Sequence, residues 1–469
     1  MKPLTIHQIR IAVGGKALTA LPKDAPSITA VCTNSKQMEP FSLFVAIRGE
    51  RVNGHDFLPA AAGGGAIAAL VEEPVKVVLP NLHLIAVEST RAAMGKLATY
   101  VRRQLQSRVI AVAGSNGKTT TKNLIDAVLR PSLKGSISPK SFNNDIGVPL
   151  AIFPADPSQD YLVLEVGTNH HGEVKLLSEM ALPDMAVITN VGAEHLEGLD
   201  DLDGVRREEA SIVTGLNPKG CLIVNGDDAP LVSLVSRYSG QIIKFGLNAQ
   251  GNDLFATDIE CDHTGVHFHL NGNTRRRWFV PLLGRHSACN ALAAIAVGKK
   301  MNIPEDAMIE SLAHAHTPDM RLQLSKVNGV TVLNDAYNAN PNSTRAAIET
   351  LVALPASGRR VAVLGDMLEL GKQSDQYHRE AGVLAANSKL DLLICVGKKA
   401  QLIASSAKAA GMEAPRIVTY PDATTAARGV TRRVRGSDLI LLKGSRSVGL
   451  EAVARAIEER DKKFTRKAV

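Results

Sequence analysis

The stretch from residue 108 to residue 129 constrains the fold of this chain more than any other. An apolar run over residues 108–113 leads directly into Gly114-Ser115-Asn116-Gly117-Lys118-Thr119-Thr120-Thr121, and a helical pattern follows over residues 122–129. A strand, a glycine-containing loop and a helix in this order form a phosphate site, because loop N–H groups and the helix N-terminus point at the anion. The stretch therefore predicts an α/β domain that binds a nucleotide.

Two side chains of this loop are suited to phosphate chemistry. Lys118 can place a positive charge near the β- and γ-phosphates, and the Thr119 hydroxyl can bind Mg²⁺. The common pattern G-x-x-x-x-G-K-[ST] would put glycine at position 112, where this chain has Val112. The loop is therefore a variant of the common phosphate-binding loop.

The rest of the chain indicates three α/β domains. Its 469 residues suggest about three domains, at roughly 150 residues each. Changes in pattern near residues 107 and 317 predict a small N-terminal domain over 1–107, a central P-loop ATPase-type domain over 108–317 and a C-terminal domain over 318–469. Residues 253–280 alternate as an antiparallel insertion would. Beyond residue 330, apolar runs alternate with helix-length segments, which predicts a Rossmann-like, doubly wound parallel sheet.

Composition narrows the class of protein. A content of 45% hydrophobic and 21% charged residues excludes a disordered polymer and a collagen. The formal net charge of +8 suits an anionic ligand, although a solvated surface rich in Lys and Arg would give the same value. Five widely spaced cysteines without a C-x-x-C pair indicate a reducing compartment. With no signal-peptide pattern and no run of about 18 apolar residues, we expect a soluble cytoplasmic protein.

Two further residues near strand ends are candidates for metal binding. Glu165 ends the apolar run 161–166. A buried carboxylate is costly unless it is paired or binds a cation, so either a Mg²⁺ shared with Thr119 or an ion pair with Lys or Arg is expected. His195 also follows a strand-like run, over 185–189. Its chemistry alone favours an ordinary hydrogen-bonding histidine, because Mg²⁺ prefers oxygen ligands.

Polar residues follow three of the strand-like runs in the C-terminal part. They occupy segments 334–343, 365–371 and 442–446. Because parallel strands present their carboxyl ends at one edge of a sheet, we expect these segments to converge and to hold a nucleotide or a peptide.

Taken together, these segments resemble the Mur ligase family over essentially the whole chain. The segments that carry the resemblance are 34–36, 43–49, 54–57, 114–120, 141–149, 284–286, 290–294 and 335–341. The resemblance implies a monomeric ATP- and Mg²⁺-dependent ligase of three domains, the first of which binds a uridine nucleotide. It implies that D-alanyl-D-alanine is added to UDP-N-acetylmuramoyl-tripeptide through an acyl phosphate.

The resemblance also implies roles for individual residues. Those implied to contact ATP are Gly114, Ser115, Asn116, Gly117, Lys118, Thr119, Thr120, Asn290, Arg321, Asp335 and Asn338. Those implied to contact the other substrates are Ser35, Asn143, Asn144, Tyr337 and Asn340. The resemblance implies that Glu165 and His195 are magnesium ligands. Thr119 is expected to join them through its hydroxyl, and Glu209 is expected to join them for the reason given below. Lys118, Glu165, His195 and Glu209 are the residues expected to act in catalysis.

The chain departs from the family pattern at two positions. Asn34 stands where the family usually has aspartate, at the start of the first uridine-nucleotide segment. Glu209 stands where relatives carry a lysine that is carbamoylated to give a magnesium-binding carboxylate. The neighbouring Arg207 is a poor substitute, because its guanidinium stays protonated. We therefore expect Glu209 to supply the carboxylate directly.

Three alternative functions are less compatible with the sequence. A folylpolyglutamate synthase would share the loop but would not carry the uridine-nucleotide segments. The ligase that adds the third peptide residue would show an Asp-Asn-Pro-Arg motif, which this chain lacks. A nucleotide-dependent switch that binds nucleic acid is disfavoured by the 17 aromatic residues and by the lack of a known RNA or DNA module.

Overall fold

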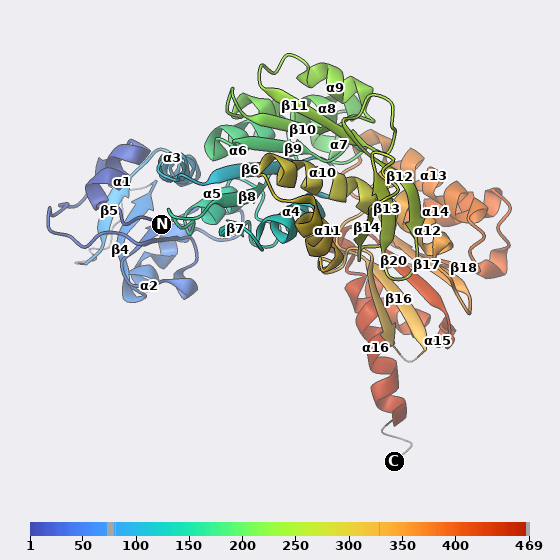
Figure 1. Ribbon diagram of the computed structural model, residues 1–469. Coiled ribbons are helices and arrows are strands. Elements are labelled where there is room, and N and C mark those ends of the chain that lie inside the picture. Colours follow the sequence, from blue (N-terminus) through green and yellow to red (C-terminus); the bar gives the residue numbers. More distant parts are fainter. Residues whose placement is uncertain (73–78, 80, 328, 466–469) are drawn as a thin grey trace.

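The computed structural model describes residues 1–72, 79, 81–327 and 329–465, and successive parts of the chain form three sheets (Figure 1). The first sheet has the order β1-β5-β4-β3-β2, and only β1 is antiparallel to its neighbour. Its strands are β1 (Lys16–Ala17), β2 (Ala30–Cys32), β3 (Ser42–Val45), β4 (Ala66–Val71) and β5 (His83–Ala86). The helices that follow or flank it are α1 (Ile6–Val13), η1 (Ser35–Gln37), η2 (Gly54–Phe57), α2 (Leu58–Gly63) and α3 (Thr90–Arg102). We call these elements the first unit.

The second sheet has nine strands in the order β14-β13-β12-β11-β10-β9-β6-β8-β7. They are β6 (Arg108–Ala113), β7 (Gly135–Ile137), β8 (Tyr161–Glu165), β9 (Met185–Ile188), β10 (Cys221–Asn225), β11 (Gln241–Gly246), β12 (Leu254–Cys261), β13 (Val266–Leu270) and β14 (Arg277–Val280). Strands β12, β13 and β14 pair antiparallel, which confirms the predicted insertion. The main helices of this central unit are α4 (Lys118–Leu129), α5 (Gly147–Ile152), α6 (Glu173–Ala181), α7 (Leu196–Leu199), α8 (Leu202–Ala210), α9 (Ala229–Val235), α10 (His286–Lys300) and α11 (Glu305–Ala313).

The third sheet has the order β15-β16-β20-β17-β18-β19. Its strands are β15 (Gln323–Val327), β16 (Val330–Asp335), β17 (Arg360–Gly365), β18 (Leu392–Val396), β19 (Ile417–Tyr420) and β20 (Leu439–Lys443). The helices of this third unit are α12 (Pro341–Ala353), α13 (Ser374–Asn387), α14 (Ala400–Ala409), α15 (Ala423–Arg433) and α16 (Glu451–Thr465). The five strands from β16 to β20 are parallel, as predicted, with helices between them.

The structure corrects the sequence expectations at three points. The third sheet is not wholly parallel, because β15 joins its edge as an antiparallel hairpin partner of β16. Strand β4 was not expected, because its Ala-rich apolar sequence does not distinguish a buried strand from a helix. Helix α4 begins at Lys118 instead of at residue 122, directly after Gly117 in a left-handed conformation.

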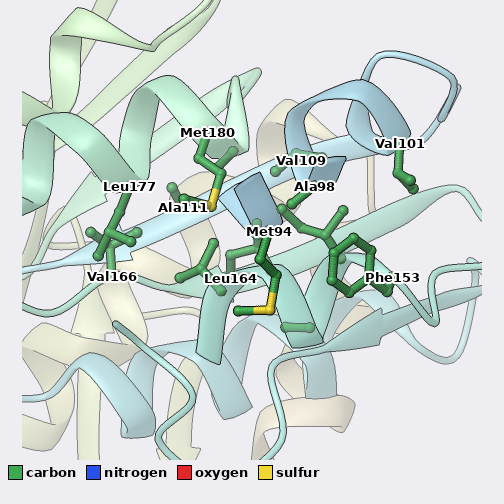
Figure 2. Packing of buried hydrophobic residues seen from close by; sticks show 14 of the residues in the cluster. Met94, Ala98, Val101, Val109, Ala111, Phe153, Leu164, Val166, Leu177 and Met180 are labelled. Carbon is green, nitrogen blue, oxygen red and sulfur yellow. The ribbon is translucent and has the colours of Figure 1, made fainter. Parts of the chain in front are cut away.

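Helix α3 packs against the central sheet and so joins the first two units. Figure 2 shows Met94 and Ala98 of this helix beside Ala111 of β6 and Leu164 of β8, within one continuous apolar cluster. Gly95 of the same helix faces the end of the Met180 side chain on α6. The first unit is therefore attached to the central unit through a shared core.

A second apolar cluster joins the central and third units. Leu196 and Leu199 of α7 are buried together with Leu364, Met367 and Leu370 of the third unit. Segment 193–199, which contains His195, therefore packs with the third sheet. Within the part of the chain that the structure describes, no helix is long and apolar enough to span a membrane.

Candidate active site

The glycines of the phosphate-binding loop are required by its backbone. Gly114 and Gly117 have φ angles of 117° and 83°, in a region that side-chain-bearing residues rarely adopt. A Cβ at Gly117 would also lie 2.5 Å from Asn290 Oδ1, and one at Gly114 would clash with Thr189. The loop can therefore adopt this conformation only with glycine at both positions.

Lys118 lies at the first position of α4 and is folded back onto its own loop. Its Nζ donates hydrogen bonds to the carbonyl oxygens of Gly114 (2.6 Å) and Ser115 (3.3 Å), and lies 3.7 Å from Glu194 Oε1. Burial by itself lowers the pKa of Lys118, but the carboxylates of Glu194, Glu209 and Glu165 together raise that pKa above its ordinary value. The side chain therefore stays charged and can be drawn to an anionic ligand.

Glu165 sits at the end of β8 and is held by three donors. Thr119 Oγ1 donates to Oε2 at 2.9 Å, Asn143 Nδ2 donates to Oε1 at 3.0 Å, and Lys122 Nζ lies 3.3 Å from Oε2. The ion pair with a lysine, one of the two alternatives raised by the sequence, is therefore present, and the Mg²⁺ shared with Thr119 stays a prediction.

Lys122 was not among the predicted site residues, although it is only 1% exposed. One turn along α4 from Lys118, its Nζ donates to Ser138 O at 2.8 Å and to Lys140 O, in addition to its ion pair with Glu165. Burial lowers the pKa of Lys122, and Glu165 opposes that shift. The lysine therefore links the nucleotide-binding helix to the start of the 141–149 segment.

We expect Lys122→Met to destabilise the protein. Removal of one partner of a buried ion pair leaves the other charge uncompensated and costs roughly 3 kcal/mol or more. The change should appear as a lower midpoint of urea-induced unfolding. Lys140→Met is the matched control, because the Lys140 side chain is exposed and contributes only its carbonyl oxygen. Equal midpoints for the two variants would contradict the assignment.

Glu209 lies on α8, and its side chain contacts the phosphate-binding loop. It is 1% exposed, and its Oε2 accepts the Gly114 N–H at 2.7 Å. Burial raises the pKa of Glu209 to about 7, although Lys118 acts in the opposite direction. The carboxylate expected to replace the carbamoylated lysine therefore contacts the first residue of the phosphate-binding loop.

His195 stands at the start of α7 with a left-handed φ of 51°. Its Nδ1 lies 2.5 Å from Glu369 Oε2 of the third unit, and its Nε2 lies 3.9 Å from Glu194 Oε2. Burial lowers the pKa of His195, but the hydrogen bond to Glu369 and the charge of Glu194 raise it overall. The imidazole is therefore set between two carboxylates.

Residues of the third unit reach the nucleotide-binding loop. Arg321 Nη2 donates to Thr119 Oγ1 at 3.3 Å, and the Arg321 guanidinium lies 4.4 Å from the centre of the Tyr337 ring. Tyr337 in turn donates to Ser141 Oγ at 2.7 Å. Asn340 Nδ2, beside the N-terminus of α12, donates to Asn116 Oδ1 at 2.8 Å.

The three polar strand ends of the third sheet converge as predicted. Asp335 of β16 pairs in register with Lys443 of β20, and Lys443 Nζ lies 2.9 Å from Asp335 Oδ2 and donates to the carbonyl oxygen of Asn338. Burial lowers the pKa of Lys443, and Asp335 opposes that shift. The third strand end joins them through Ser445 Oγ, which accepts the Leu368 N–H at 2.9 Å.

One cleft of about 830 Å³ connects these groups. The predicted residues that line it are Ser115, Asn116, Gly117, Lys118, Thr120, Asn143, Asn144, Glu165, His195, Asn290, Arg321, Asp335, Tyr337, Asn338 and Asn340. Gly114, Thr119 and Glu209 are not among its lining residues, although Thr119 contacts the lining residue Glu165, and Ser35 lies in η1 of the first unit. Glu50 and Arg91 of the first unit also line the cleft.

Glu194 is a cleft residue that belongs to none of the predicted motifs. It is 5% exposed, and its Oε1 accepts no hydrogen bond from any residue that the structure describes. The signal was its place directly before His195, since a short loop after a strand carries both side chains to the same edge of the sheet. Glu194 adds a third carboxylate around Lys118.

Comparison with known proteins identifies the family. The Mur ligase family, catalytic domain, matches residues 27–102, the Mur ligase middle domain matches residues 112–298, and the Mur ligase, glutamate ligase domain, matches residues 320–446. The UDP-N-acetylmuramoyl-tripeptide--D-alanyl-D-alanine ligase of Bacillus subtilis is 37% identical over 92% of this chain and 93% of its own length. The chain belongs to the Mur ligase family.

Solved structures agree with this membership in the Mur ligase family. MurF from Acinetobacter baumannii superposes with a TM-score of 0.88 and 30% identity, over 98% of this chain and 99% of that one. MurF ligase from Thermotoga maritima in complex with ADP gives a TM-score of 0.82 and 28% identity, over 93% and 98%. The expected three-unit α/β architecture is confirmed.

The four predicted magnesium ligands do not form a ready-made metal site in this Mur ligase. Among the residues that the structure describes, no three His, Cys, Asp or Glu side chains are grouped so that they could hold a metal ion. Thr119 and Glu165 are in contact, whereas His195 is paired with Glu369 and Glu209 with Gly114. Mg²⁺ at nucleotide sites takes one or two carboxylates and completes its shell with phosphates and water, so the protein alone need not supply a cluster.

Proposed function

We propose that this Mur ligase uses ATP to join D-alanyl-D-alanine to UDP-N-acetylmuramoyl-tripeptide, a step in the synthesis of peptidoglycan precursors. The observation that carries the proposal is the single cleft in which the phosphate-binding loop, the 141–149 segment and the polar strand ends of the third sheet meet. The names of the similar proteins supply the identity of the substrates.

The reaction that fits this cleft has two chemical steps. The terminal carboxylate of the peptide attacks the γ-phosphorus of ATP, ADP leaves, and an acyl phosphate forms. The amine of the dipeptide then attacks the acyl carbon, and inorganic phosphate leaves from the tetrahedral intermediate. Both steps require charge neutralisation and alignment more than covalent help from the protein, which suits Lys118 and the loop N–H groups.

We propose that Mg²⁺ accompanies the nucleotide and that Thr119, Glu165, His195 and Glu209 face it. The donor set supports this, because the contact of the Thr119 hydroxyl with the Glu165 carboxylate offers two hard oxygen ligands at the head of α4. A bound Mg²⁺ would neutralise phosphate charge. Lys122 would keep the Glu165 carboxylate aimed at that position.

Each substrate is assigned to one part of the chain in this proposal. Residues 1–107, including Ser35, would bind the uridine-nucleotide end, residues 108–317 would bind ATP, and residues 318–469 would bind the dipeptide. Contacts that support the last assignment are those of Tyr337 with Ser141 and of Asn340 with Asn116, because they bring the third unit to the 141–149 segment and to the loop. A monomer in the cytoplasm is the form in which we expect the enzyme to act.

A turnover assay tests the proposed function. We expect phosphate release from ATP and Mg²⁺ only when D-alanyl-D-alanine and a UDP-N-acetylmuramoyl-tripeptide are both present. Separate assays with the lysine-containing and the diaminopimelate-containing tripeptide identify the accepted third residue. Phosphate release without either substrate, or release stimulated by nucleic acid, would contradict the ligase assignment.

A further inference from the structure

The first unit contributes a single arginine or lysine to the cleft, among the residues that the structure describes. The arginines and lysines that line the whole cleft are Arg91, Lys118, Arg321 and Lys443. Lys118 belongs to the phosphate-binding loop, and Arg321 and Lys443 come from the third unit. Neither the sequence motifs nor the proposed mechanism assigns a role to Arg91, the remaining member of this set.

The chain on both sides of the cleft wall at Arg91 is held in place. Arg91 is the second residue of α3, and the Ser89 hydroxyl at the start of this helix accepts the Ala92 N–H at 3.3 Å. Helix α3 lies beside α5, into which the 141–149 segment leads (Figure 1). Asn144 Oδ1 accepts the Gly147 N–H at 2.8 Å, at the start of α5. The backbone of both elements therefore gives Arg91 a defined position.

Arg91 extends from the first unit to Asp145 of the 141–149 segment. Its Nη1 donates to Asp145 Oδ2 at 3.3 Å, the only hydrogen bond that the guanidinium makes to a described residue. The side chains of Arg91 and Asp145 are 48% and 33% exposed. A guanidinium carries several N–H donors in a planar fork, so most of its donors remain available. Such a fork suits the recognition of a carboxylate.

The 141–149 segment connects Arg91 with the reaction site. Asn143 stands two residues before Asp145, and its Nδ2 donates to Glu165 Oε1 at 3.0 Å. Two residues of chain span at most roughly 7 Å. The last residues of a peptide that ends at the phosphate-binding loop are therefore within reach of Arg91.

The peptide of a similar protein contains carboxylates that do not react. A solved ligase from Acinetobacter baumannii, 30% identical over 98% of this chain, is named for alanyl-D-glutamyl-2,6-diaminopimelate. A glutamyl residue has two carboxyl groups, only one of which is bonded to the next residue. Diaminopimelate also has two, only one of which receives the incoming amine. With lysine in its place, the glutamyl carboxylate alone stays free.

We propose that Arg91 binds a free carboxylate in the peptide part of UDP-N-acetylmuramoyl-tripeptide. This inference rests on the proposed function, in which the uridine end lies in the first unit and the reacting carboxylate lies at the phosphate-binding loop. The peptide then passes from the first unit to the central unit, where Arg91 lines the cleft. Asp145 orients the guanidinium by accepting one of its N–H groups.

An ion pair that only joins the two units is the alternative. An exposed ion pair contributes roughly 0 to 1 kcal/mol to stability, so either role leaves the fold intact when the charge is removed. The two roles differ in the affinity for the tripeptide. Only a carboxylate-binding role predicts that this affinity falls.

The experiment compares Arg91→Met with Arg103→Met, a change at an exposed arginine at the end of α3 that does not line the cleft. In Arg91→Met we expect KM for the tripeptide to rise on the order of 10- to 100-fold, the loss of a charged hydrogen bond. The kcat and KM for ATP should change much less, because the contact is the same before and during the reaction. Arg91→Lys should recover part of the loss, since it restores the charge without the planar fork. Arg103→Met should match the wild type.

Parallel assays with the lysine-containing and the diaminopimelate-containing tripeptide identify the carboxylate. Equal increases in KM for the two tripeptides in Arg91→Met assign the glutamyl carboxylate. An increase confined to the diaminopimelate tripeptide assigns its second carboxylate. Unchanged KM values for both, an increase confined to the lysine tripeptide, or the same increase in Arg103→Met would overturn the inference.

Isothermal titration calorimetry of each tripeptide, with ADP and Mg²⁺ present, measures binding without turnover. We expect the dissociation constant to rise in Arg91→Met by the same factor as KM. If the wild type forms product but Arg91→Met binds the tripeptides as tightly as the wild type, the inference fails and the proposed function stands. If the wild type forms no product but binds a tripeptide in a way that depends on Arg91, the proposed function fails and the carboxylate site stands.

Discussion

Lys118→Ala is expected to lower kcat by roughly two to three orders of magnitude, the loss seen when one preorganised charge or donor is removed from a transition state. The structure supports this size of effect, because Lys118 is a buried cation at the head of α4 and lines the cleft. Three carboxylates around it keep it protonated until the nucleotide arrives. Steady-state kinetics with saturating ATP measure the loss.

Two controls distinguish a loss of catalysis in Lys118→Ala from a loss of folding. The variant should retain the circular dichroism spectrum of the wild type, although loss of the buried ion pair between Lys118 Nζ and Glu194 Oε1 should lower its thermal midpoint. Lys219→Ala, a change at an exposed lysine of the same unit, should retain full activity. Near-normal turnover in a folded Lys118→Ala enzyme would refute the assignment of the loop.

Glu209→Ala is expected to lose activity on the order of 100-fold or more, because it removes a buried carboxylate from beside the phosphate-binding loop. The wild-type enzyme should also be indifferent to bicarbonate, since glutamate needs no carbamoylation to carry a negative charge. The measurement is turnover in buffer depleted of carbon dioxide and in the same buffer with bicarbonate added back.

The variant Glu209→Gln distinguishes the effect of the negative charge from the effect of the hydrogen bond to Gly114. The amide oxygen of glutamine can still accept the Gly114 N–H, which Glu209 accepts at 2.7 Å in the wild type, so the loop should keep its shape. If the negative charge is what matters, the glutamine variant should be nearly as impaired as the alanine variant. An unaffected alanine variant, or an enzyme that requires bicarbonate, would contradict the replacement of the carbamoylated lysine by Glu209.

Much of the fold was predictable because local patterns of apolar and polar residues indicate it. The β6 strand, its glycine loop and the parallel strands β16 to β20 are read from apolar runs and their spacing, which depend only on neighbouring residues. Strand β15 could not be predicted in this way, because only a strand that contains an apolar run is detected from such patterns. Its side chains are mostly exposed at the sheet edge, so it has no apolar run to detect.

The candidate site was predictable where a residue belongs to a motif and unpredictable where its partner is distant in the chain. Loop residues such as Lys118, and strand-end residues such as Asp335, line the cleft as the motifs indicated. Glu194 carries no motif of its own. Its importance follows from its burial beside Lys118, which is a property of the folded chain.

The sequence by itself determined a nucleotide-binding α/β chain with Lys118, Glu165 and His195 near strand ends, because such placements follow from the order of strands and loops. Only the tertiary structure decided which charges meet. Lys122 reaches Glu165 across 43 positions of the chain, and Glu369 reaches His195 across 174. Packing of α7 onto the third sheet makes the second contact, and hydrophobic burial of this kind is non-directional, so no local pattern specifies it.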